Sequence, residues 1–166
     1  MKKILVSFIA IMSLTHGYSQ KMSPTSEASF IYNFTRYVEW EQKDGIFNVV
    51  VLGSEEVFFA LNDYCKYKKI GNRPMRVVRA LNSEDVFKAD IIFVSKDKNS
   101  SLGSLVEKFA EKNVLLVTES DGATEGGASI NFLLVDGKLK FEASRKNIAK
   151  QNLKISSDFE KIAIMK

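Results

Sequence analysis

The chain has 166 residues, which is enough for one domain with a core of its own and too few for two typical domains. Its formal net charge of +4 falls to +2 if residues 1–19 are removed, because Lys2 and Lys3 lie among them and no acidic residue does. A surplus this small does not predict nucleic acid or an anionic membrane as the partner.

Residues 1–19 have the layout of a secretory signal peptide, with a basic start, an apolar run over residues 4–14 and small residues just before Gln20. A spanning helix needs about 20 apolar residues, so a retained membrane anchor is the weaker alternative. The sequence therefore predicts a signal peptide at 1–19 and a domain at 20–166 that is exported to the periplasm without direct membrane insertion.

His16, the only histidine, belongs to the predicted signal peptide, so the mature chain has none. This excludes Ser-His-Asp and Cys-His catalysis and histidine metal ligands. Cys65 is the only cysteine, so no internal disulfide can form, and we interpret it as an inert small residue. We expect no enzyme activity, no cofactor and no metal; an enzyme that uses carboxylates alone, such as Asp121 and Glu125, is the catalytic alternative.

The first helix of the mature chain is predicted over residues 25–40 and contains FIYNFTRYVEW, which includes the only Trp of the chain. Four of its side chains have helical spacing and are expected to face a core: Phe30, Phe34, Tyr37 and Val38. Tyr32 and Trp40 diverge from that stripe. We therefore expect part of this helix to be exposed and to contact another chain.

The remaining sequence alternates strand and helix patterns. Strands are predicted at 46–53, 75–80, 91–95 and 113–118, and helices at 54–64 and 101–112. A hairpin at 130–143 turns at Asp136-Gly137, and the end forms a short helix, a break near Asn152 and a last turn with Ser157 and Glu160 as a capping box. The pattern predicts a single α/β domain with a mostly parallel sheet, helices on both faces and a C-terminal antiparallel hairpin.

Two loops are candidate ligand sites. The basic stretch 66–79 contains Arg73 and suits an anionic ligand or an acidic partner, although a solvated loop is the simpler interpretation. The Gly-rich loop 119–129 carries Asp121 and follows a predicted parallel strand, where open sheets tend to bind ligands. A hard cation or polar ligand there is the alternative to a solvated turn.

Several motifs in chain order resemble the YfiR family of exported bacterial proteins. They are Phe30-Ile31-Tyr32-Asn33-Phe34 followed by Trp40, Gly71-x-Arg73, and Gly126-Gly127-x-x-Ile130-Asn131-Phe132. The resemblance runs from about Phe30 to Ala163 and is looser near the C-terminus. The best-understood members carry cysteine pairs that link activity to redox state, a control that Cys65 alone cannot provide.

The resemblance implies a non-catalytic periplasmic regulator in cyclic-di-GMP signalling, which binds the periplasmic part of a membrane signalling protein, for the namesake a diguanylate cyclase, and restrains it. The candidate partner-binding residues are Tyr32, Tyr37, Trp40, Phe159 and Ile162. The alternative is a periplasmic small-molecule-binding sensor module, with the two loops as pocket walls and Arg73, Asp121 and Asn131 as ligand-binding residues. A homodimer is also expected, because the aromatic helix exceeds the needs of one core.

Overall fold

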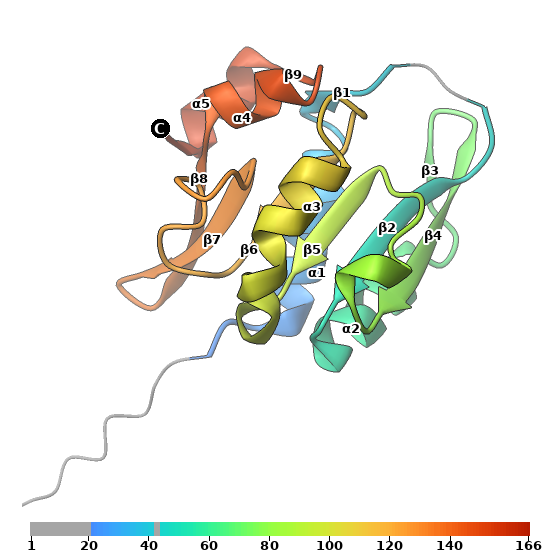
Figure 1. Cartoon of the computed structure of the whole chain (residues 1–166), viewed down its shortest axis with the longest axis horizontal. Helices are drawn as coiled ribbons and strands as arrows, with labels where there is room; N and C mark the ends of the chain where they lie inside the picture. The colour runs from blue at the N-terminus through green and yellow to red at the C-terminus, as the bar shows by residue number, and fades with distance from the viewer. Residues whose placement is uncertain (1–20, 42–43) are drawn as a thin grey trace, which may run out of the picture.

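The computed structural model describes residues 21–41 and 44–166. Within these residues, eight strands form one mixed sheet (Figure 1). In their order across the sheet they are β10 (Ile164–Met165), β8 (Lys138–Ala143), β7 (Ile130–Val135), β6 (Leu115–Thr118), β5 (Ile91–Val94), β2 (Phe47–Leu52), β4 (Arg73–Ala80) and β3 (Lys69–Ile70). A separate antiparallel pair joins β1 (Val38–Glu39) to β9 (Lys154–Ile155). Within these residues no helix has both the length and the apolar character to cross a bilayer. The predicted signal peptide lies outside the described residues.

The central strands β4, β2, β5, β6 and β7 run parallel to one another. β7 then turns back into β8 through Asp136 and Gly137, whose φ angles of 51° and 72° are those that a two-residue hairpin turn requires. The predicted fold class is confirmed, with β7 joining the parallel strands before it forms the hairpin.

Helices cover both faces of this sheet (Figure 1). Helices α1 (Pro24–Phe34) and α2 (Glu55–Cys65) lie on one face, and α3 (Leu102–Lys108) lies on the other. Alternate side chains of β2 therefore enter two different cores. Val49 and Val51 pack in the first core, under α1 and α2, and Val50 and Leu52 pack in the second core, under α3. Helices α4 (Arg145–Lys150) and α5 (Ser157–Ile162) extend the first core, and two 3-10 helices, Ser83–Asp85 and Lys96–Ser101, lie in the crossovers.

The aromatic helix is shorter than the sequence predicts, because α1 ends at Phe34 rather than near residue 40. The hydroxyl of Thr35 donates to the carbonyl oxygen of Tyr32 (2.6 Å), and the chain then enters β1, where Val38 lies opposite Ile155 of β9. Pairing with a strand more than a hundred residues away overrides the helical pattern. Trp40 therefore lies on an extended segment and not on a helix.

Three other predicted boundaries also change. The loop at 66–74 is in fact the short β3–β4 hairpin, with Gly71 at a φ of 57° in its turn. The helix predicted at 101–112 ends at Lys108. The cap of α5 is Ser156, whose hydroxyl accepts the amide hydrogen of Phe159 (3.3 Å), so the expected capping box starting at Ser157 is wrong by one residue.

Cys65 ends α2 inside the first core and is 1% exposed. Burial raises the pKa of its thiol from 9 to about 11, so the reactive thiolate is disfavoured at neutral pH. This agrees with the interpretation of Cys65 as an inert small residue.

Glu27 in the first turn of α1 is a buried carboxyl group, 2% exposed, and its Oε1 has no hydrogen-bond partner within the described residues. Burial raises its pKa from 4.5 to about 8, and the nearby carboxylate of Glu119 acts in the same direction. Burial also raises the pKa of Glu119, whose Oε1 accepts the amide hydrogen of Lys96 (3.1 Å). Lys21, which pairs with Glu56 at the surface, opposes the shift of Glu27.

Removing this ionisable group should flatten the dependence of stability on pH. The folded state keeps a proton on Glu27 that the unfolded state loses above about pH 4.5, so the free energy of unfolding falls as pH rises toward about 8, by up to about 1.4 kcal/mol per pH unit. We expect the Glu27→Gln variant to lose much of this slope in urea denaturation series at about pH 5 and about pH 8.5. Glu107→Gln, at an exposed position of α3, is the matched control, and equal slopes in both variants would contradict the assignment.

Candidate functional site

Arg73, the first residue of β4, makes an ion pair with Asp90 that is almost fully buried. One guanidinium nitrogen lies 2.8 and 2.9 Å from the two carboxylate oxygens and also donates to the carbonyl oxygen of Ile46 (2.8 Å). The guanidinium carbon lies 5.0 Å from the centroid of the Phe47 ring, a cation–π distance. The cation is therefore held in one orientation by an anion, a carbonyl and an aromatic ring.

Asp90 holds this group against the amino ends of the central strands. Its carboxylate accepts the amide hydrogen of Asn48 in β2 (2.8 Å), and its own amide donates to the Asn48 carbonyl oxygen (2.8 Å). Its carbonyl oxygen accepts the amide hydrogen of Leu115 at the start of β6 (2.9 Å). One residue thus fixes the relative positions of β2, β4 and β6.

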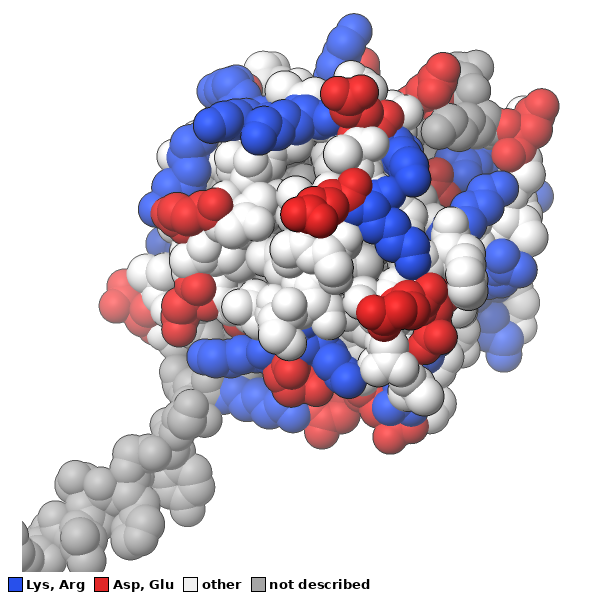
Figure 2. All heavy atoms as spheres, viewed as in Figure 1, with Lys and Arg blue, Asp and Glu red and all other residues white. Residues whose placement is uncertain are grey.

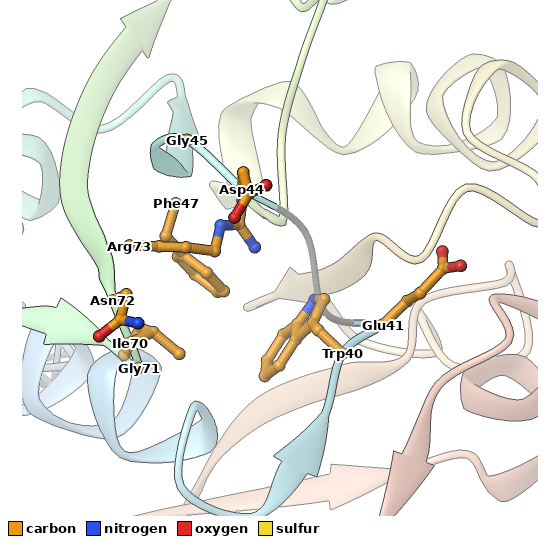
Figure 3. Close-up of a pocket in the computed structure, with 9 residues that line it drawn as sticks. All are labelled: Trp40, Glu41, Asp44, Gly45, Phe47, Ile70, Gly71, Asn72 and Arg73. Carbon is orange, nitrogen blue, oxygen red and sulfur yellow. The ribbon is translucent and has the colours of Figure 1, made fainter.

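Trp40 completes the cluster from the extended segment after β1. Its indole Nε1 donates to the Asp90 carbonyl oxygen (3.3 Å), and its ring meets the Phe47 ring edge to face, with centroids 5.2 Å apart. Figure 3 shows Trp40 and Arg73 reaching the same space from two different elements, with Phe47 between them. We call Trp40, Phe47, Arg73 and Asp90 the Trp40 cluster.

A pocket of about 580 Å³ opens beside the Trp40 cluster (Figure 3). Its lining residues are Trp40, Glu41, Asp44, Gly45, Phe47, Ile70, Gly71, Asn72 and Arg73. The Nε of Arg73 is buried without a hydrogen-bond partner among the described residues. The site combines aromatic walls with fixed polar groups, a combination that is common in ligand pockets.

The other predicted partner-binding residues lie on two surfaces. Tyr32 packs against Tyr64 (5.5 Å between centroids), and the ammonium group of Lys68 lies 4.7 Å from each ring. Tyr37 packs on Phe159 (6.3 Å), and its carbonyl oxygen accepts the amide hydrogen of Ser156.

The two C-terminal candidates differ in exposure. Ile162 is 54% exposed, as expected, but Phe159 is fully buried, so the expectation that it is an exposed apolar position is wrong. Its ring is surrounded by those of Phe34, Tyr37 and Phe141. The aromatic core under α5 therefore holds Phe159 inside, where it supports the surface that Ile162 forms.

The predicted ligand-binding residues do not converge. Arg73 begins β4 at the amino edge of the sheet, whereas Asp121 follows the carboxyl end of β6, and the strands between them are parallel. A single pocket walled by both loops is therefore ruled out. Asp121 is exposed and lies 3.6 Å from Lys96, in a smaller recess at the carboxyl edge.

Asn131 is fully buried, and its side chain hydrogen-bonds to the start of the Gly-rich loop. Its Oδ1 accepts hydrogens from the Thr118 hydroxyl (2.8 Å) and the Ser120 amide (2.9 Å), and its Nδ2 donates to Glu142 (3.2 Å). Its polar atoms are used within the protein. Among the described residues no group of three or more His, Cys, Asp or Glu side chains is placed to hold a metal ion.

Sequence reasoning missed Asp90 and Phe47, which complete the site. Both were assigned only to strand patterns, since a single acid before an apolar run and a Phe within one carry no motif. Trp40 and Arg73 were singled out separately, and nothing in their spacing of thirty-three residues indicated that they meet.

A protein-family model described as YfiR/HmsC-like matches residues 25–163, which is most of the chain. The matched region contains every residue of the Trp40 cluster. No curated protein matches the chain.

Breaking the ion pair should cost far more stability than breaking a surface pair. Asp90→Asn leaves the Arg73 guanidinium buried without a counter-charge, and we expect the free energy of unfolding to fall by about 3 kcal/mol. Arg79→Ala is the matched control, since its pair with Glu55 (2.7 Å) is largely exposed and its loss should cost less than about 1 kcal/mol. Urea denaturation followed by the emission of Trp40, the only Trp, measures both, and equal costs would contradict the structural role of Asp90.

Proposed function

The chain belongs to the YfiR/HmsC-like family, and from that premise we propose that it binds the periplasmic part of a membrane signalling protein, such as a diguanylate cyclase, and restrains it. The family is one of non-catalytic periplasmic regulators of signalling proteins. The identity of the partner and the restraining direction of the regulation go beyond the family assignment and belong to the proposal.

The Trp40 cluster is the observation that carries the proposal. Three of the residues by which the sequence resembles the family, Trp40, Gly71 and Arg73, come from distant segments and line one pocket. Trp and Arg dominate the binding energy of protein interfaces when they sit at well-packed positions. Here both are held rigidly before any partner arrives, so little conformational entropy opposes binding.

A second part of the proposed surface lies around α5. Tyr37 connects it to the Trp40 segment, because the Ser156 amide donates to the Tyr37 carbonyl oxygen (2.9 Å) and β1 pairs with β9. The exposed Ile162 offers an apolar contact at the other end of α5. We infer that Tyr37, Trp40 and Ile162 belong to one partner-facing region.

Restraint of a partner needs only a difference in affinity for its two states. A regulator that binds the inactive state more tightly by about 2.7 kcal/mol shifts the balance about a hundredfold. A surface with one rigid aromatic anchor and a few flanking contacts is sufficient for a difference of that size.

Deleting the protein in the bacterium that makes it should raise the cellular level of cyclic-di-GMP, and re-expression of the wild-type protein should return that level to its original value. We expect the Ile162→Asp variant to lower the level only in part, because a charge at an exposed apolar position weakens the contact with the partner without disturbing the core. The Trp40→Ala variant should lower the cyclic-di-GMP level even less, because it removes the aromatic side chain that we propose as the anchor of the interface. Glu107→Asp on α3 is the control that should restore the wild-type level.

The measurement is mass spectrometric quantification of cyclic-di-GMP, with the amount of periplasmic protein checked for each variant. An unchanged level on deletion would rule out a cyclase as the restrained partner. Photo-crosslinking from Asn72, at the rim of the pocket, would then identify which other membrane protein is bound.

The alternative function, a small-molecule sensor, is favoured by the pocket itself. Its volume of about 580 Å³ lies in the range of ligand sites, about 300–1,000 Å³, and Trp40, Phe47 and Arg73 line it. We expect a true ligand to raise the melting temperature with concentration and to change the Trp40 emission together. A melting shift without an emission change would place the ligand elsewhere, and a flat screen of carboxylates and amines would count against this alternative.

A further inference from the structure

The outer edge of β4 is open along most of its length. The short strand β3 covers only Arg73 and Pro74, and the Met75 amide donates to the Lys68 carbonyl oxygen (3.0 Å). Beyond that point, residues 76–80 pair with β2 on the inner side and have no strand on the outer side within the described residues. In Figure 1 this edge forms one margin of the molecule. An open edge of this length can accept an added strand.

Basic side chains follow this edge. Figure 2 shows Lys and Arg side chains gathered along the margin where Figure 1 places β3 and β4. Within the described residues, Lys66, Lys69 and Arg76 have no carboxylate in ion-pair distance, and Arg76 instead donates to the amide oxygen of Asn48 (2.8 Å). These charges are available to an incoming acidic chain.

Apolar side chains flank the same edge. Tyr67 is 87% exposed beside β3, Phe59 on α2 is 59% exposed, and Val78 on β4 is 38% exposed. The β3–β4 hairpin also supplies Ile70 and Arg73 to the pocket of the Trp40 cluster. The open edge is therefore continuous with the proposed partner-facing region.

We propose that β4 accepts an extended, acidic segment of a partner protein as an additional strand along residues 76–80. This rests on the proposed function and names the chemistry of the bound segment. A pair of two copies through this edge is disfavoured, because it would bring two basic edges together. A homodimer, which the sequence predicts, would use another surface.

The test uses the mature chain and three synthetic peptides of equal length. The first alternates Glu and Val, the second alternates Lys and Val, and the third is the first with alternate backbone nitrogens methylated. The Glu-Val peptide should bind and slow amide hydrogen exchange at residues 76–80. The methylated peptide keeps the charge but loses backbone donors, so we expect at least about tenfold weaker binding. The Lys-Val peptide should not bind.

The other open edge provides a matched control. β10 covers only Glu142 and Ala143 of β8, which leaves residues 138–141 unpaired on that side within the described chain, with Lys138 and Lys140 among them. The double variant Lys66→Glu/Lys69→Glu should weaken binding of the Glu-Val peptide at least about tenfold, whereas Lys138→Glu/Lys140→Glu should not. Protection at 138–141 instead of 76–80, equal binding of the methylated peptide, or no binding would overturn the proposal.

Cellular assays separate this proposal from the proposed function. If deletion of the protein leaves cyclic-di-GMP unchanged, the cyclase partner is wrong, while peptide binding at β4 stands on its own measurement. If deletion raises cyclic-di-GMP and the Lys66→Glu/Lys69→Glu variant restores it fully, the partner does not use this edge, and the proposal fails although the function holds.

Discussion

The position of Asp90 is the constraint on which the rest of this structure depends. Its carboxylate neutralises Arg73, and its backbone joins β2 and β6 through hydrogen bonds to Asn48 and Leu115. Its carbonyl oxygen also receives the indole hydrogen of Trp40. A buried anion is tolerated only when its hydrogen-bonding capacity is met, and here the groups that meet it are those that form the pocket. The residue that joins these strands therefore also shapes the pocket at the amino edge of the sheet.

The carboxyl edge, where parallel sheets usually bind ligands, holds the smaller recess beside Asp121, and much of the rest of it is filled by protein atoms. Gly53 has a φ of 102°, and a Cβ there would lie 1.8 Å from the Ser95 hydroxyl, which donates to the Leu52 carbonyl oxygen. Farther along, Asn131 and Glu142 tie down the Gly-rich loop. Backbone and side chains thus occupy much of the crevice that the fold class would normally offer, and the larger of the two pockets lies at the opposite edge.

Sequence patterns were sufficient for the elements whose signal is local. The apolar strands, the Ser54 cap of α2 and the Asp136-Gly137 turn follow from neighbouring residues, so they were predictable. The end of α1 was not, because Val38 and Glu39 have helical spacing and are extended only through contact with β9. The candidate site has the same limitation. Trp40 and Arg73 were recognised singly, but their meeting depends on Asp90, which no local pattern marks. The burial of Phe159 was not predictable either, because its ring partners come from two distant regions, the end of α1 with the turn after it and β8.

The pairing of β1 with β9 has a consequence for the order in which the protein matures. Residues 154–156 hold the segment that leads to Trp40, and they follow the strands of the parallel core in the chain. The central strands can assemble earlier, since the parallel core of β2, β4, β5 and β6 is complete by Thr118. Chains shortened before Lys154 would thus keep the strands of the central sheet but lose the pairing that positions the Trp40 segment.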